Sequence, residues 1–144
     1  MKSPEVARQP KPRVLVVDDE QGNLDAFWRV FRKHFELTLA RSANDALRRA
    51  AEENFDVVIT DYAMPGRNGV DLLTELASEQ PDAARLLLTA HADLPEVNEA
   101  KAAGTAHGVL MKPWEEETVR HWVTSYHHRV MLRRAVHVMR TTAK

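Results

Sequence analysis

The segment at residues 55–69, FDVVITDYAMPGRNG, limits the possible folds more than any other part of the chain. It contains a β-branched apolar run at residues 57–59, of the length expected for a strand buried on both faces. An acid, Asp61, follows the run closely, and a Pro-Gly break follows at residues 65–66. An acid at the end of a buried parallel strand lies where open α/β sheets bind ligands, although it also often only caps a turn. Both interpretations stay open on this segment alone.

The rest of the chain alternates short apolar runs with amphipathic segments. We expect strands at residues 14–17, 36–40, 57–59, 85–88 and 109–111. The helix after the first strand carries its apolar stripe at Leu24, Phe27, Trp28, Phe31 and Phe35. Ser42 is the expected N-cap of the second helix, and further helices are expected near residues 70–76, 95–103 and 114–140. Five strands alternating with five helices over short connections predict a right-handed parallel α/β sheet.

Composition fits one domain of this kind. The 144 residues are 44% hydrophobic, which is enough for a single sizeable core, and cysteine is absent, which excludes disulfides and thiolate metal sites. No apolar run is long enough to cross a bilayer, and residues 1–11 lack a signal-peptide segment, so we expect a cytoplasmic protein without membrane contact. Residues 1–12 contain three prolines and no periodic pattern, which predicts a flexible lead-in.

The charge is distributed unevenly along the chain. Up to Glu117 there are 14 lysine and arginine residues against 21 acids, a net charge of −7. The remaining residues carry six basic side chains and no acid, a net charge of +6. A basic end on an acidic body indicates either a contact with an anionic partner or a solvated helix face.

The expected strands end in a set of polar side chains. The first strand leads to Asp18 and Asp19, the third to Asp61, the fourth to Thr89 and the fifth to Lys112. The carboxyl ends of parallel strands share one edge of the sheet, so these residues can converge on one cleft. Clustered carboxylates need a cation between them, and oxygen ligands without histidine or cysteine suit Mg²⁺. With a lysine and a hydroxyl added, the set describes a site for a phosphoryl group carried by a carboxylate.

With these motifs, the chain resembles the receiver domain of two-component response regulators. The matching segments are VLVVDDE, VVITDYAMPGRNG, LLLTA and KPW, at residues 14–20, 57–69, 86–90 and 112–114. The resemblance covers about residues 13–130. It implies a flavodoxin-like, doubly wound five-stranded sheet of order 2-1-3-4-5 and an aspartate that accepts a phosphoryl group from a sensor histidine kinase or a phosphotransfer protein.

The resemblance also assigns roles to individual residues. It implies that Asp61 is the phosphoacceptor and that Asp19, Asp61 and the backbone carbonyl of Ala63 bind Mg²⁺ directly. Asp18 is then expected to hold the waters of the metal and to orient Lys112, which pairs with the phosphoryl oxygens.

Further roles concern the switch. The resemblance implies a cis peptide bond before Pro113 and a Thr89 side chain that moves to the phosphoryl group. Two positions differ from the family pattern: Val109 replaces the usual aromatic partner of the threonine, and Ala63 has no polar side chain to contact an attacking water. His91, two residues after the threonine, remains a candidate for contact with water or a partner, although such a residue is more often a solvent-facing loop residue.

Two other functions compete with phosphorylation-controlled signalling. A haloacid-dehalogenase-type phosphatase needs a second acid two residues after its nucleophile, and Ala63 stands there. A DNA-binding regulator needs a further domain, but only 27 residues follow Glu117 and most of them complete the last helix. We therefore expect a non-enzymatic phosphoacceptor that signals by protein–protein contact, without direct nucleic-acid binding. The alternative is a receiver fragment of a longer regulator with a separate output domain.

Residues 131–144 are expected to extend the last helix beyond the receiver domain. Apolar spacing continues through Leu132, Val136 and Met139, and neither glycine nor proline interrupts residues 114–140. A single amphipathic extension would leave this stripe in water, so we expect two copies to pair through it, with Arg133, Arg134 and Arg140 at the margins. A frayed tail or a helical linker is the alternative.

Overall fold

The computed structural model describes residues 10–142, so most of the expected lead-in at residues 1–12 and the last two residues lie outside the described part. Five parallel strands form one sheet in the order β2-β1-β3-β4-β5. They are β1 (Arg13–Val17), β2 (Glu36–Ala40), β3 (Val57–Asp61), β4 (Ala84–Thr89) and β5 (Gly108–Met111). The predicted flavodoxin-like sheet and its strand order are confirmed, and each strand lies within about two residues of its predicted run.

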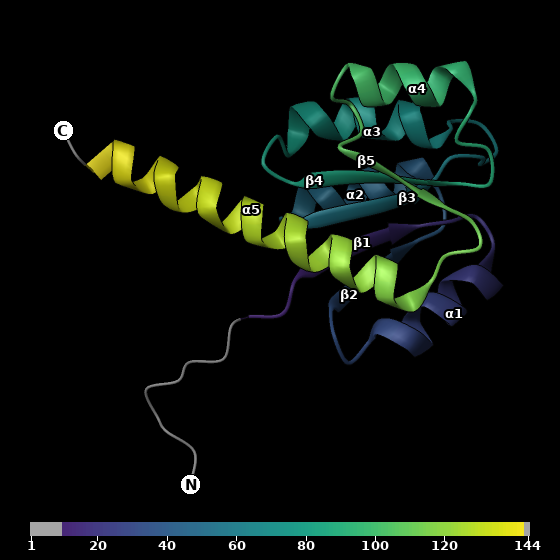
Figure 1. Ribbon diagram of the computed structural model, residues 1–144, viewed down its shortest axis with the longest axis horizontal. Coiled ribbons are helices and arrows are strands. Elements are labelled where there is room, and N and C mark those ends of the chain that lie inside the picture. The colour runs from purple at the N-terminus through teal and green to yellow at the C-terminus, as the bar shows by residue number, and fades with distance from the viewer. Residues whose placement is uncertain (1–9, 143–144) are drawn as a thin grey trace, which may run out of the picture.

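Helices cover both faces of the sheet (Figure 1). They are α1 (Gln21–Phe31), α2 (Ala43–Glu52), α3 (Gly69–Glu79), α4 (Pro95–Ala102) and α5 (Glu116–Thr142). One apolar core lies between the sheet and α2, α3 and α4, and a second lies between the sheet and α1 and α5. β3 is buried along its whole length, which explains its continuous apolar run.

The amphipathic pattern after β1 needs two corrections. The pattern places Phe35 in the first helix, but α1 ends at Phe31. Phe35 is nevertheless buried, because the turn after the helix brings its ring to 5.3 Å from that of Phe31. Trp28, predicted in the same apolar stripe, is 45% exposed. The stripe that faces the core is therefore narrower than the sequence pattern indicates.

The last helix is long and continuous. α5 starts two residues after Trp114 and runs to Thr142 without a break, well beyond the edge of the sheet (Figure 1). Val119, Val123 and Val130 face the core, whereas Leu132 and Val136 are 55% and 46% exposed. Within residues 10–142, no helix combines the length and the apolar character that a membrane crossing requires.

A buried aspartate holds the far part of α5 against the sheet. Asp56 directly precedes β3, and its Oδ2 accepts a hydrogen bond from the backbone N–H of Arg13 at 2.8 Å. Its Oδ1 accepts one from Nη1 of Arg134 on α5 at 2.7 Å, and Nε2 of His127 lies 3.6 Å from Oδ2. Arg134, predicted at the margin of a dimer, contacts the amino end of the sheet within the chain itself.

Candidate functional site

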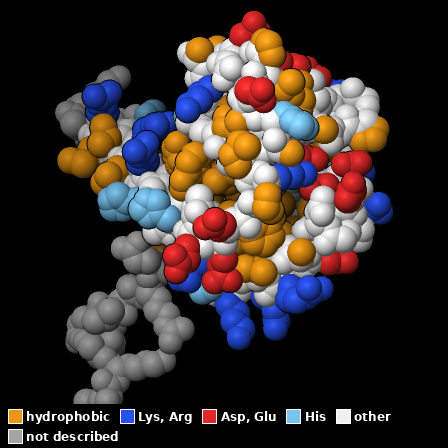
Figure 2. All heavy atoms as spheres, turned by 45° about the vertical axis from the view of Figure 1, so that its right-hand side comes forward, with side chains coloured by type: hydrophobic (Ala, Val, Ile, Leu, Met, Phe, Trp, Pro, Cys, Tyr) orange, Lys and Arg blue, Asp and Glu red, His pale blue; other side chains and the backbone are white. Residues whose placement is uncertain are grey.

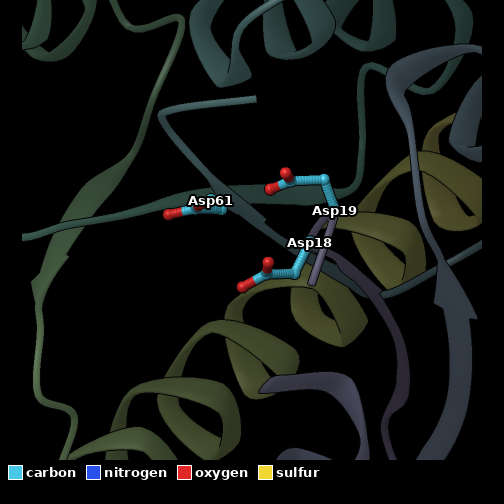
Figure 3. Close-up of side chains that lie close together, drawn as sticks. All are labelled: Asp18, Asp19 and Asp61. Carbon is cyan, nitrogen blue, oxygen red and sulfur yellow. The ribbon is translucent and has the colours of Figure 1, made fainter. Parts of the chain in front are cut away.

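Three carboxylates meet at the carboxyl ends of β1 and β3. Asp18 and Asp19 follow β1, and Asp61 is the last residue of β3. The two strands are neighbours and pair Val17 with Thr60, so their ends coincide. One carboxylate oxygen of each aspartate lies within 4.8 Å of the others, and the three side chains point to the same side (Figure 3). Such a group of oxygens is able to hold a divalent cation.

Lys112 supplies the positive charge closest to this cluster. Its Nζ lies 2.7 Å from Oδ1 of Asp61 and 4.0 Å from Oδ2 of Asp18. The backbone N–H of Lys112 donates to the carbonyl oxygen of Thr89 at 2.9 Å, which fixes the end of β5 beside the end of β4. The peptide bond between Lys112 and Pro113 is cis. One ammonium therefore faces three carboxylates, and the site keeps a negative balance.

That balance affects the acid–base properties of Asp61. Burial raises the pKa of the Asp61 carboxyl, and the neighbouring charges of Asp18 and Asp19 raise it further. The hydrogen bond and the charge of Lys112 act in the opposite direction without cancelling these effects. A cation bound among the three carboxylates would favour the ionised form, which is the form that can act as a nucleophile.

Asp18 is held firmly in place. Its Oδ1 accepts a hydrogen bond from the backbone N–H of Glu20 at 2.9 Å, and its Oδ2 accepts one from the side-chain amide of Asn23 at 3.1 Å. Asn23 lies in the first turn of α1 and was not singled out by the sequence pattern. The two bonds orient the Asp18 carboxylate toward the cluster.

The residues expected to act as a switch lie around the same edge. Thr89 is buried at the end of β4, and its hydroxyl oxygen accepts the backbone N–H of His91 at 3.0 Å. His91 and Ala63 are exposed in the loops after β4 and β3, respectively. Val109 on β5 packs half-buried against the core on the α2, α3 and α4 side, where the family pattern has an aromatic ring.

Gly69, at the end of the loop after β3, has a packing role that the sequence pattern did not indicate. A Cβ at Gly69 would lie 2.4 Å from the backbone oxygen of Asp61, closer than real contacts allow. The Gly69 N–H donates to the carbonyl oxygen of Tyr62 at 2.8 Å, and Asn68 and Asp71 form a capping box at the start of α3. The glycine thus lets α3 begin directly against the backbone of Asp61.

A second set of contacts ties this loop to α4. The Tyr62 hydroxyl donates to Oε2 of Glu96 at 2.6 Å, and the side-chain amide of Asn68 donates to Oε1 at 3.1 Å. Bonding to the Glu96 carboxylate raises the pKa of the Tyr62 hydroxyl. The residue after Asp61 is therefore connected to the first turn of α4, 34 residues further along the chain.

A hollow of about 570 Å³ adjoins the carboxylate cluster between α1 and the loop after β5. Figure 2 shows hydrophobic side chains gathered around a basic side chain on this part of the surface. Its polar lining comes from Asp18, Asn23 and Lys112, and its walls are apolar, with Leu24, Phe27, Ile59, Leu88, Pro113 and Trp114 among them. The cluster is thus accessible from outside and bordered by an apolar surface.

Comparison with known proteins identifies regulators that share this sequence pattern. A family model described as the response regulator receiver domain matches residues 14–124. The transcriptional regulatory protein PrrA of Mycobacterium leprae is 35% identical over 104 residues, which are 72% of this chain and 44% of PrrA. The hydrogenase transcriptional regulatory protein HoxA of Cupriavidus necator is 29% identical over 101 residues, 70% of this chain and 21% of HoxA. The chain thus spans less than half the length of either relative.

Solved structures have the same fold as this chain over nearly its whole length. A response regulator receiver domain protein from Clostridium thermocellum has a TM-score of 0.78 and 31% identity, covering 84% of this chain and 98% of that one. A structure described as adenylate cyclase from Rhodopirellula baltica has a TM-score of 0.87 and 25% identity, covering 92% of this chain and 98% of that one. The similarity therefore extends over almost the full length of both neighbours.

Proposed function

Because the chain belongs to the response regulator receiver domain family, we propose that it accepts a phosphoryl group on Asp61 from a histidine kinase or a phosphotransfer protein. The observation that supports this most directly is the position of Asp61. It is a buried carboxylate at a strand end, 2.7 Å from the Lys112 ammonium and within 4.8 Å of two further carboxylates. Active sites commonly hold buried charges of one sign close together, because such an arrangement shifts the pKa of the reacting group.

The transfer itself is a substitution at phosphorus. An Asp61 oxygen attacks the phosphorus of a phosphohistidine, the P–N bond breaks, and its electron pair leaves with the imidazole, so an acyl phosphate forms. The Lys112 ammonium then pairs with the phosphoryl oxygens in place of the free carboxylate oxygen. Thr89 gives up the hydrogen bond that it accepts from the His91 N–H, and its hydroxyl donates a hydrogen bond to a phosphoryl oxygen.

The donor set fits Mg²⁺, because three carboxylates and one ammonium leave a negative charge that an ion with oxygen ligands would balance. Asp19, Asp61 and the carbonyl oxygen of Ala63 would bind the ion, and Asp18 would bind its waters. When bound, the ion offsets the charge that accumulates on the phosphoryl oxygens. Ala63 and His91 would tune hydrolysis, and we expect slow loss of the phosphoryl group, because Ala63 offers no polar side chain to place a water.

Phosphodonor labelling tests the proposal. Intact-mass spectrometry after exposure to acetyl phosphate and Mg²⁺ should show one added phosphoryl group, which Asp61→Asn abolishes. Asp82→Asn removes an exposed acid elsewhere and serves as the matched control. Full labelling of Asp61→Asn would contradict the assignment of the phosphoacceptor. Undiminished labelling in excess chelator would contradict the assignment of the metal.

We further propose that the receiver domain, about residues 13–130, signals by protein contact and that residues 131–144 mediate pairing of two copies. Val109 provides no ring to follow Thr89 inward, so the readout has to use another surface. Leu132 and Val136 are exposed on the part of α5 beyond the sheet, where hydrophobic and basic side chains lie together (Figure 2). A receiver joined to a separate output domain is the alternative, since PrrA and HoxA are both longer than the match.

Sedimentation can decide about pairing. A cut after Val130 would also remove the Arg134–Asp56 contact, so a double substitution, Leu132→Gln with Val136→Gln, is the cleaner test. We expect a dimer for the parent chain and a monomer for the double variant. A monomeric parent chain at high concentration would exclude the pairing while leaving the phosphoacceptor role intact.

A further inference from the structure

A small basic hollow lies at the end of the sheet opposite the carboxylate cluster. It has a volume of about 50 Å³ and is formed by the amino end of β4, the start of β5 and the middle of α5. Its lining is Ala84, His107, Tyr126, Arg129, Val130 and Arg133. Ala84 and Val130 are buried and form an apolar floor, while the other four side chains supply polar edges. Among the residues that the structure describes, no acid lines this hollow.

The polar edge is held by specific contacts. The Tyr126 hydroxyl donates to the carbonyl oxygen of His107 at 3.0 Å, and the Arg129 guanidinium lies 5.2 Å from the centre of the Tyr126 ring. A Cβ at Gly108 would lie 3.2 Å from that hydroxyl and 2.4 Å from the Trp122 ring, so the glycine permits this close approach of α5. The Tyr126 and His107 side of the hollow is thus fixed by packing of α5 on the sheet, and the exposed side chains of Arg129 and Arg133 form its outer rim.

His107 lines the hollow, and one of its ring nitrogens is already bonded within the sheet. Its Nδ1 accepts the backbone N–H of Arg85 at 2.9 Å, so in the neutral ring the proton is on Nε2. Burial lowers the pKa of the His107 imidazole, and the charges of Arg85, Arg133 and Arg129 lower it further. Three cations are therefore close enough to act on one imidazole.

These cations lack a balancing anion. Within residues 10–142, no carboxylate lies within 4.0 Å of the guanidinium nitrogens of Arg85, Arg129 or Arg133. Arg85 is buried, and its guanidinium donates to backbone carbonyl oxygens, those of Ala83, Gly104 and Thr105. Two other arginines of α5 differ, because Arg134 is paired with Asp56 and Arg120 lies near Glu116. A converging, uncompensated positive charge next to a hollow is the property expected of an anion site.

We propose that His107, Tyr126, Arg129 and Arg133 form a binding site, here called the α5 anion pocket, for the terminal phosphate group of a small molecule. Arg129 and Arg133 are one helical turn apart and present two guanidinium groups to one side, a fit for the several oxygens of a phosphate. The His107 Nε2–H adds a donor from the sheet. A terminal phosphate carries close to two charges, whereas a diester in a nucleic-acid backbone carries one, so the cluster favours the former.

Binding of inorganic pyrophosphate, without Mg²⁺ and at constant ionic strength, tests this site. We expect saturable changes in the NMR signals of His107, Arg129 and Arg133, and a rise in the pKa of the His107 imidazole on binding. Arg133→Gln should weaken binding at least tenfold, and Arg129→Gln should do the same. Arg120→Gln removes the same charge from another position of α5 and should leave the affinity unchanged.

Several outcomes would overturn the proposal. Changes that never saturate, or that weaken equally in Arg133→Gln and Arg120→Gln, would show general attraction to a basic helix. A short oligonucleotide without terminal phosphate that binds as tightly as pyrophosphate would assign the surface to a nucleic-acid backbone instead. Both arginine variants change exposed side chains of α5, and retention of the parent's circular dichroism spectrum is the check on their folding.

Discussion

Strand β3 has a buried aspartate at each end, and the two differ in their surroundings. Asp56 precedes the strand and Asp61 ends it, and both are 6% exposed. Each has a cationic nitrogen 2.7 Å from its Oδ1, Arg134 Nη1 for Asp56 and Lys112 Nζ for Asp61. By burial and by ion pair alone, the two carboxylates are alike.

The balance of charge around them distinguishes the two. Asp56 faces a guanidinium, an imidazole and a backbone N–H, and no acid of residues 10–142 joins it in that contact set. Asp61 faces one ammonium and two further carboxylates, and its pKa is raised. The negative charge of Asp56 is therefore balanced by its neighbours, whereas that of Asp61 is not. Protonation, a bound metal ion or a covalent modification of the carboxylate would relieve the excess at Asp61. Excess charge of one sign, rather than burial, marks the end of the strand that carries the candidate site.

Neutralising the two aspartates should have different effects on stability. Asp56→Asn leaves Arg134 and His127 without their anion and should lower the free energy of unfolding by about 2–3 kcal/mol, below the full value for a buried pair because Arg134 is partly exposed. Asp61→Asn removes repulsion among the carboxylates and should leave stability unchanged or raise it by up to about 1 kcal/mol. Urea denaturation without Mg²⁺ measures both, and equal losses would refute the distinction.

Mg²⁺ should act on one end of β3 alone. An ion that binds only the folded chain stabilises it by about 2.7 kcal/mol at a hundred times its Kd. Thermal unfolding with and without MgCl₂ should show this gain in the parent chain and in Arg134→Gln, whose change lies at the other end of the strand. Asp61→Asn should lose most of the gain. A gain of the same size in Asp61→Asn would place the ion elsewhere.

The sequence predicts the fold and the carboxylate cluster for the same physical reason. Buried strands need uninterrupted apolar runs, and a parallel sheet brings the ends of those runs together, so the pattern alone groups Asp18, Asp61 and Lys112. Their roles in phosphotransfer remain predictions.

The amino end of β3 could not be predicted in this way. Asp56 looks like any polar residue before a strand, and its partner Arg134 is 78 residues away. Helical periodicity identifies an apolar stripe on α5 but not where that helix lies on the sheet, so the pattern places Arg134 at a dimer margin. The burial of Phe35 after the end of α1 has a similar cause, since a turn can return a side chain to the core without helical spacing.

The pH dependence of stability should report on the Asp61 end of β3. Because the pKa of folded Asp61 is raised, the folded chain holds this proton more tightly than the unfolded chain does. The stability contribution of Asp61 is therefore fully present below the unfolded pKa of about 3.9 and is lost as the pH rises through the folded value. The difference in unfolding free energy between Asp61→Asn and the parent should grow as the pH rises across this range. A difference that stays constant with pH would contradict the raised pKa.

The smallest expected effect concerns the contact between Tyr62 and Glu96. Tyr62→Phe removes one hydroxyl and keeps the ring, so the half-buried Glu96 carboxylate loses its hydrogen bond at 2.6 Å but keeps the one from Asn68. A loss of about 1 kcal/mol is expected for one such bond. Because the contact joins the loop after Asp61 to α4, amide exchange should speed up in α4 and not in α5. Tyr126→Phe, which removes the hydroxyl bonded to the His107 carbonyl at the amino end of the sheet, should show the reverse pattern. Faster exchange of both helices in both variants would mean that the two ends of the sheet open together. The two ends would then differ in their charge balance but not in their local stability.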